Sequence, residues 1–399
     1  MKKLIVLFLL FLLSGCVGPF KELKYQIEDG WNSDALEGTP STLSDITNNK
    51  RIEILWTASI GSQTLWDAKN ESQEAAPIDI FIYEEFLFTL SHDGKVKKIN
   101  LSDGKSVWEK SFDFKVTAGL SGDSDYLLFV SNEGELWCLD HNGKELWKTY
   151  VGGKVAVSPL VYSTFVTVKL NNNKFVQLNI LDGSIKWEYQ SATPPLTINF
   201  QGKMIFSDGV LYSGLPVGKL LAIEAETGSL IWEATVSQSK GVTEIDRAND
   251  ITSQPVIDKS IIYAISSNGG KINAIDRRTA QSLWDRPLSS FVGLNLYGND
   301  VIVVHETNSI YSLDNEAGKT NWRSIDLQYR NIGRGVIIGD SFAVGDFAGY
   351  LHFINLIDGK LTNRIRLSDS QITNNIIAIN EHKIIVMDLN GNIYCLEIN

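Results

Sequence analysis

Six tryptophans recur along the chain at intervals of 38 to 52 residues, and each one ends a strand-like segment that follows a tight turn. The six are Trp108, Trp147, Trp187, Trp232, Trp284 and Trp322. The turns before them are Asp-Gly, Asn-Gly, Thr-Gly and close variants. Such turns between alternating apolar runs indicate hairpins, because they need positive φ angles. A period of this length with several short strands is typical of one four-stranded blade of a β-propeller.

The number of repeats predicts how the ring closes. Seven complete units run from about residue 78 to about residue 367, and the seventh has Asn363 at the tryptophan position. The last unit, Asn375 to Asn399, stops before a tryptophan strand, and Ile52 to Thr57 supplies the missing strand with Trp56. We therefore predict an all-β fold, an eight-bladed propeller of four-stranded antiparallel blades closed by its N-terminal strand. Trp56 and the six other tryptophans are expected to pack between adjacent blades.

The N-terminus has the three parts of an export signal. Lys2 and Lys3 precede the apolar run from Leu4 to Leu13, which is too short to span a bilayer comfortably, and small residues lead into Cys16. Leu13 to Cys16 also matches the bacterial lipobox, which implies that the chain is cut before Cys16 and acylated there. Val17 after the cysteine implies sorting to the outer membrane. The expected organisation is a signal peptide (1–15), a lipidated cysteine with a flexible polar tether (16–50) and the propeller (51–399).

Composition and spacing argue against several classes of function. The net charge of −11 argues against a nucleic-acid partner and against direct adhesion to anionic lipid heads. Cys138 and Cys395 occupy the same place in non-adjacent repeats, which predicts buried free thiols and no disulfide. The five histidines lack metal-ligand spacing, and neither a nucleophile elbow nor a glycine-rich phosphate loop is present. We expect no catalytic residue, no metal and no cofactor.

Two stretches break the repeat, Ser191 to Gly218 and Val236 to Gln254, and the second accounts for the longest interval between tryptophans. Both are predicted to project as loops from one face of the ring. Long loops on a rigid scaffold are suitable binding sites, although an insertion without any partner is the alternative. The stretch from Gln63 to Pro77 is a weaker departure of the same kind.

The blades resemble those of the eight-bladed quinoprotein alcohol dehydrogenases. Those enzymes also carry a pair of adjacent cysteines and calcium ligands around a quinone at the centre of the ring. This chain has no adjacent cysteines and is shorter than those enzymes need to be. A quinoprotein-like dehydrogenase therefore remains as one alternative. A periplasmic propeller that binds peptides or polysaccharides through its central funnel or a strand edge is another.

Two stretches resemble the BamB family, the propeller lipoproteins of the outer-membrane β-barrel assembly machinery. One is Thr243 to Arg247 with Gln254 to Val256, and the other is Val344 to Asn355 in the seventh unit. The resemblance implies a non-enzymatic scaffold, lipid-anchored in the outer membrane and facing the periplasm. It implies binding to the periplasmic domains of the central barrel subunit, as one monomer of a hetero-complex, and assistance in folding and inserting outer-membrane proteins. Direct contact with unfolded client proteins is left open.

The resemblance also suggests contact residues in the two departures from the repeat. The apolar pair of the first loop falls on Leu196 and Ile198, and the neighbouring basic position is Asn199 here. The acidic pair of the second loop falls on Asp250 and Thr252, of which only Asp250 keeps its charge. Apolar anchors would then lie at the centre of the patch, with Asp250 and Arg247 at a polar rim. The alternative is that Leu196 and Ile198 face the core of the blade.

Overall fold

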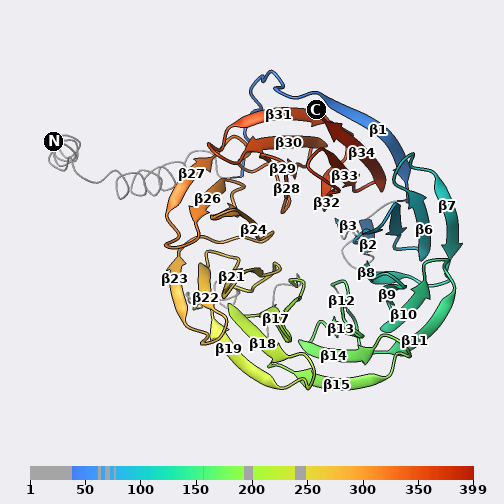
Figure 1. Ribbon diagram of the computed structural model, residues 1–399. Coiled ribbons are helices and arrows are strands. Elements are labelled where there is room, and N and C mark those ends of the chain that lie inside the picture. The colour runs from blue at the N-terminus through green and yellow to red at the C-terminus, as the bar shows by residue number, and fades with distance from the viewer. Residues whose placement is uncertain are drawn as a thin grey trace.

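The computed structural model describes residues 38–61, 64–67, 72–75, 78–155, 157–192, 201–238 and 249–399. Within these residues 32 of the 34 strands form eight four-stranded antiparallel sheets, arranged as the blades of a ring, and the other two form a separate hairpin (Figure 1). The predicted fold class is confirmed. Within the described residues, no helix is both long enough and apolar enough to cross a membrane.

Each blade is built from strands that follow one another in the sequence, from the centre of the ring to its rim (Figure 1). The first four blades are β4 to β7 (Phe81–Tyr83, Phe86–Leu90, Lys95–Asn100, Ser106–Ser111), β8 to β11 (Val116–Gly122, Tyr126–Ser131, Glu135–Asp140, Glu145–Tyr150), β12 to β15 (Leu160–Tyr162, Phe165–Lys169, Lys174–Asn179, Ile185–Gln190) and β16 to β19 (Ile205–Ser207, Val210–Leu215, Lys219–Glu224, Leu230–Thr235). The next three are β20 to β23 (Val256–Asp258, Ile261–Ile265, Ile272–Asp276, Ser282–Arg286), β24 to β27 (Leu294–Tyr297, Asp300–Val304, Ile310–Asp314, Thr320–Ser324) and β28 to β31 (Val336–Ile338, Ser341–Gly345, Tyr350–Asn355, Leu361–Arg366).

The eighth blade combines strands from both ends of the described chain. It contains β32 to β34 (Ile372–Ala378, Lys383–Asp388, Asn392–Ile398), and its outermost strand is β1 (Ile52–Ser59). β1 pairs antiparallel with β34, and two backbone hydrogen bonds between Arg51 and Asn399 extend this pairing. The predicted closure of the ring is therefore confirmed, and it leaves no unpaired gap between the seventh and the first blade.

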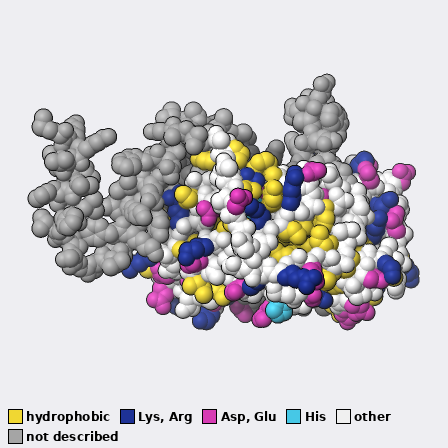
Figure 2. Space-filling model, turned by 90° about the horizontal axis from the view of Figure 1, so that it is seen from above, with side chains coloured by type: hydrophobic (Ala, Val, Ile, Leu, Met, Phe, Trp, Pro, Cys, Tyr) yellow, Lys and Arg dark blue, Asp and Glu magenta, His cyan; other side chains and the backbone are white. Residues whose placement is uncertain are grey.

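The antiparallel order of the strands gives the ring two distinct faces. The turn face carries the turns between the first and second strands and between the third and fourth strands of each blade. The loop face carries the turns between the second and third strands and the connections from one blade to the next. The rim between the two faces shows hydrophobic side chains interspersed with charged ones of both signs (Figure 2).

The outer strands direct one large side chain each toward the next blade. In every blade the pairing of the outermost strand shifts register just before the tryptophan position, so the preceding residue bulges outward. Val107 in the first blade is such a residue, and it is 54% exposed. The bulge explains why apolar side chains lie on the rim while the neighbouring tryptophan is shielded.

Each of the seven tryptophans binds the following blade in the same way. Its indole N–H donates to a backbone carbonyl at the outer turn of that blade, over 2.7 to 3.0 Å. The tryptophans are Trp56, Trp108, Trp147, Trp187, Trp232, Trp284 and Trp322, and the acceptors in the same order are Leu101, His141, Ile180, Ala225, Arg277, Asn315 and Leu356. Six of the rings lie against a turn glycine, where a Cβ would approach the ring to 3.2 Å or less. A small residue is therefore required at this turn, because a larger one would collide with the tryptophan ring.

Two regions differ from what the sequence suggests. The stretch from Gln63 to Pro77, expected as a loop, contains the antiparallel hairpin β2 (Thr64–Asp67) and β3 (Ser72–Ala75). Residues 38–50, expected within the flexible tether, are hydrogen-bonded to the sixth and seventh blades. The reason is that their polar groups bond to groups of a remote blade, which a local pattern does not reveal. Residues 16–37, including Cys16, lie outside the described residues.

Candidate functional site

The two predicted binding loops belong to one kind of connection. Residues 193–200 join the fourth blade to the third, and residues 239–248 join the fifth blade to the fourth, so the described residues on either side of both lie at the loop face. Leu196, Ile198, Asn199 and Arg247 lie outside the described residues. Their contact role stays a prediction, and the structure describes the base on which both loops rest.

Asp250 lies at the base of the second loop and faces inward. Its side chain is only 3% exposed, and one carboxylate oxygen accepts the N–H of Val217 in the fourth blade over 2.9 Å. Its backbone carbonyl accepts two bonds from Ser267 in the fifth blade, from the N–H at 2.9 Å and from the hydroxyl at 3.0 Å. Asp250 therefore fastens the end of the loop to two blades, whereas the resemblance suggested a residue at an exposed rim.

Thr252, the second residue of the former acidic pair, is also buried. Its hydroxyl donates to the carbonyl of Phe291, in the connection to the sixth blade, over 3.0 Å. Thr252 thus continues the attachment that Asp250 begins. The structure brings these two predicted residues together, but as supports of the loop base rather than as an accessible surface.

Lys169, at the end of β13, is a buried residue that the sequence analysis missed. Its ammonium group is 1% exposed and donates to the carbonyl of Gly214 over 2.6 Å. Burial lowers the pKa of Lys169 to about 7, although the nearby carboxylate of Asp250 opposes this effect. The equivalent positions in other blades are apolar, for example Leu90 and Val130, so a charged residue within this repeat position was an available signal.

The centre of the ring, where a quinone would lie in a propeller dehydrogenase, is crossed by polar side chains. Lys203 of the fourth blade donates to Asp79 of the first blade over 2.7 Å, and Asp79 also accepts the hydroxyl of Ser158. Arg334 of the seventh blade donates to Gln254 of the fifth blade over 3.0 Å. These bonds join blades that are not neighbours. The arrangement does not fit a flat cofactor at the ring's centre, and the adjacent cysteine pair of the quinoproteins is missing from the sequence.

Neither the cysteines nor the possible metal ligands among the described residues form a reactive site. Cys138 and Cys395 are free and buried, and burial raises their pKa values to about 12 and about 11, so both thiols stay protonated. Within the described ranges, no three His, Cys, Asp or Glu side chains are grouped as metal ligands.

Comparison with known proteins assigns the family. A sequence profile described as outer membrane protein assembly factor BamB matches residues 92–324 and 295–399. The chain belongs to the BamB family. It is 27% identical to the outer membrane protein assembly factor BamB of Bordetella pertussis over 342 residues, which are 86% of each chain. BamB proteins are outer-membrane assembly factors, and this chain is a member of that group.

Solved structures support the same fold. The crystal structure of BamB from Moraxella catarrhalis superposes with a TM-score of 0.77 at 21% identity, covering 87% of this chain and all of that one. The quinohemoprotein alcohol dehydrogenase from Comamonas testosteroni superposes with a TM-score of 0.67 at 11% identity, covering 90% of this chain and 78% of that one. At these identities the two structures share the ring with this BamB-family chain, and they do not establish a shared reaction.

Proposed function

We propose that the protein is a non-enzymatic scaffold of the outer-membrane β-barrel assembly machinery. In this proposal it binds the periplasmic domains of the central barrel subunit and assists the folding and insertion of outer-membrane proteins. The observation that carries the proposal lies at the loop face, around the fourth and fifth blades. There, two connections that break the repeat arise side by side, and Asp250 and Thr252 tie the second of them to the ring.

The rigid base favours binding because it limits the entropy lost on association. Because Asp250 and Thr252 already fix the end of the second loop to neighbouring blades, less conformational freedom is lost at that end when a partner binds. Leu196 and Ile198 are proposed as the apolar anchors of this contact, with Asn199 and Arg247 beside them. Asp250 and Thr252 are proposed to act indirectly, by positioning the second loop.

The proposal includes a lipid anchor. The export signal and the lipobox at Cys16 support acylation of that cysteine, and Val17 supports an outer-membrane location facing the periplasm. Two or more acyl chains at one cysteine give stable attachment, whereas a single chain gives marginal attachment. The protein would thus remain next to a partner that is itself embedded in the outer membrane.

Calorimetry with the mature lipoprotein in detergent and the purified periplasmic domains of the barrel subunit tests the contact. Leu196→Glu with Ile198→Glu should weaken binding by about tenfold or more, because charges replace apolar anchors. The matched control is Leu181→Glu with Ile357→Glu, which places the same charges at turn-face residues that are 63% and 79% exposed. The control should bind as the wild type does. Equal binding by both double variants would show that the contact lies elsewhere.

A further inference from the structure

Residues 38–50 form a strap that crosses the full height of the ring. At its C-terminal end, Arg51 bonds to Asn399 and Lys50 forms an ion pair with Asp340, a residue of the turn between β28 and β29. This end therefore lies at the turn face. At its N-terminal end, Ser41 bonds to the connection between β27 and β28, which lies at the loop face.

The strap follows β31 in the antiparallel direction. The N–H of Asn49 donates to the carbonyl of Thr362 over 3.4 Å. The side chain of Asn48 then both accepts the N–H of Arg364, over 2.9 Å, and donates to its carbonyl, over 3.1 Å. Further along, the guanidinium of Arg364 donates to the carbonyl of Ser44 over 3.0 Å. Figure 1 shows this segment in blue outside β31. The repeated contacts hold the strap to one path along the rim.

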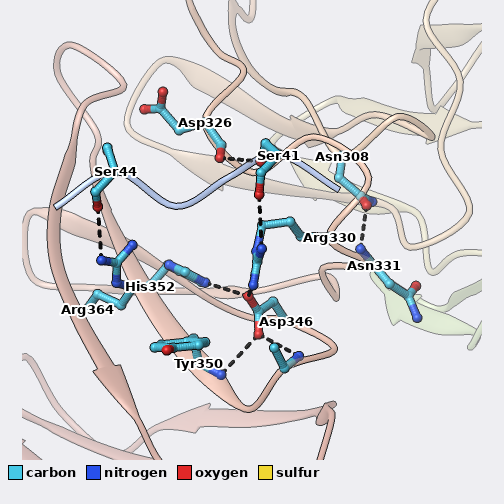
Figure 3. Close-up of polar contacts among 11 residues, drawn as sticks. Ser41, Ser44, Asn308, Asp326, Arg330, Asn331, Asp346, Tyr350, His352 and Arg364 are labelled. Carbon is cyan, nitrogen blue, oxygen red and sulfur yellow. Dashed lines mark hydrogen bonds and ion pairs between the residues drawn. The ribbon is translucent and has the colours of Figure 1, made fainter. Parts of the chain in front are cut away.

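A buried ionic cluster holds the N-terminal end of the strap (Figure 3). The carbonyl of Ser41 accepts a bond from the guanidinium of Arg330 over 3.0 Å, and the N–H and hydroxyl of Ser41 donate to Gln328 and Asp326 over 2.9 and 2.7 Å. The same guanidinium donates to the carboxylate of Asp346 through two nitrogens, over 2.7 and 2.6 Å.

Asp346 is itself fixed from several directions. It is fully buried, accepts the ring N–H of His352 over 2.9 Å and accepts the backbone N–H groups of Ala348 and Tyr350 over 2.9 and 3.0 Å. Asp346, Ala348, Tyr350 and His352 belong to the stretch from Val344 to Asn355 that resembles the family in the sequence, whereas Arg330 precedes it. Asp346 thus holds the Arg330 guanidinium in one orientation through two nitrogens on one carboxylate oxygen, and charge-assisted hydrogen bonds of this kind are stronger than neutral ones.

We infer that the strap transfers the attachment point of the lipid tether from the turn face to the loop face, so that the loop face is the side held toward the membrane. This inference rests on the proposed acylation of Cys16. Without the strap, the tether would leave the ring at Arg51 on the turn face. With the strap, it leaves at Gly38, which lines a cavity of about 270 Å³ together with the loop-face residues Phe291, Asn308 and Tyr329.

Chain geometry gives the physical reason for a preferred orientation. About 22 peptide units join Cys16 to Gly38, so they reach at most roughly 75 Å when fully extended. A ring held with its turn face toward the membrane would force these residues to pass the height of a blade first, which is about 20 Å for a six-residue strand. The orientation with the loop face toward the membrane therefore leaves the tether the greatest conformational freedom. It also directs the proposed contact loops toward the membrane-embedded partner.

Fluorescence quenching in liposomes tests the orientation. The full-length lipidated protein carries a dye at Glu133→Cys on the loop face or at Glu226→Cys on the turn face, where both native side chains are exposed. Cys138 and Cys395 are buried and should escape labelling. A quencher on the lipid headgroups should quench the loop-face dye several times more strongly than the turn-face dye. Equal quenching of both dyes, or stronger quenching at the turn face, would overturn the inference.

Flotation with the liposomes separates this inference from the proposed function. Protein that floats but shows equal quenching would be anchored without a preferred face, so the strap inference alone would fail. Protein that does not float would show that Cys16 provides no anchor. The anchor and the strap inference would then be overturned, whereas the contact with the barrel subunit is tested separately by calorimetry.

Variants of the strap provide the matched comparison. Ser41→Pro with Asn48→Ala removes bonds at both ends of the strap and should make the quenching of the two dyes similar. Asn172→Ala with Ser184→Ala removes side chains of the same kind from exposed turns away from the strap and should leave the difference unchanged. Hydrogen exchange gives an independent check on the wild type, because the Ser41 N–H is bonded to Gln328. Exchange of this N–H as fast as in a free peptide would overturn the inference.

Discussion

The side chain of Asn363 donates a hydrogen bond of 2.8 Å to the backbone carbonyl of Lys50, at the junction between the seventh and eighth blades. This bond replaces the indole-to-carbonyl bond that a tryptophan makes at each of the seven other junctions. The turn that would lie under a tryptophan is absent here, because the third and fourth strands of the eighth blade, β34 and β1, are not consecutive and meet at Asn399 and Arg51 instead. A small amide reaches the acceptor where a large ring would have no glycine turn to pack against.

Removing this amide should weaken the closure of the ring. Asn363 is 2% exposed, so Asn363→Ala leaves the carbonyl of Lys50 without this donor in a shielded place and should cost about 1–3 kcal/mol of unfolding free energy. Differential scanning calorimetry should show a lower Tm. Asn321→Ala, at an exposed position of the sixth blade's outer strand, serves as the comparison. A Tm for Asn363→Ala at or above that of Asn321→Ala would contradict this role.

The packing of tryptophan on a turn glycine predicts a position-specific effect of adding one methyl group. At Gly183 a Cβ would lie 2.5 Å from the ring of Trp147, and the φ of Gly183 is +69°. Gly183→Ala should therefore destabilise the ring by about 1–3 kcal/mol more than Gly209→Ala. Gly209 has a φ of +79° but no atom within 4 Å of the added Cβ, so it controls for backbone strain alone. Equal losses in thermal or denaturant melts would show that packing on Trp147 is unimportant.

The buried ammonium of Lys169 predicts a stabilising substitution. Its pKa of about 7 in the folded protein lies below the value near 10.4 expected in the unfolded chain. Folding is therefore penalised fully below about pH 7, and the penalty fades as the pH rises toward about 10.4. Lys169→Met should stabilise the protein by about 1–4 kcal/mol at neutral pH and by little above pH 10.4. Denaturant melts across this range check the prediction, with Lys219→Met, at a partly exposed lysine that is paired with Glu233, as control. A gain independent of pH would argue against burial of the charge as the cause.

The cluster around Asp346 predicts an acid-sensitive contribution to stability. Burial raises the pKa of Asp346, but bonds from His352, Tyr350 and Arg330 outweigh it and hold the pKa below its ordinary value. Its contribution is therefore present above about pH 3.9 and is lost as the pH falls through the lowered pKa. Asp346→Asn should cost about 3–5 kcal/mol, because it leaves Arg330 without its buried partner.

An exposed ion pair gives the comparison for that substitution. Asp358→Asn breaks the pair with Lys360, whose side chain is 79% exposed, and should cost about 0–1 kcal/mol. Urea melts at pH 7 measure both losses. Equal and small losses would show that the buried cluster does not stabilise the seventh blade.

The sequence predicted the ring well because its determinants are local and repeated. Turns with glycine, alternating strands and the spacing of the tryptophans all report the same unit, and the incomplete last unit identified Ile52 to Thr57 as the closing strand. The strap could not be predicted, since Ser41, Ser44 and Asn48 form bonds with residues about 285 to 320 positions away. A polar segment of this kind has the composition of a linker.

The contact site was predicted less completely for a related reason. Asp250 was expected at an exposed rim, but a single acidic residue in a loop carries no signal of burial, and its acceptor role became visible only with Val217 beside it. Lys169 did carry a signal, because it interrupts an apolar position of the repeat. The positions of Leu196 and Ile198 relative to a partner remain predictions.

Co-purification from solubilised outer membranes tests the central claim most directly. The lipidated protein, tagged at its C-terminus and expressed at native levels, should retain the central barrel subunit when captured in mild detergent. Leu196→Glu with Ile198→Glu should lose the barrel subunit while keeping the wild-type melting curve, and Leu181→Glu with Ile357→Glu should retain it. Failure of the wild-type protein to retain the barrel subunit would contradict the scaffold account.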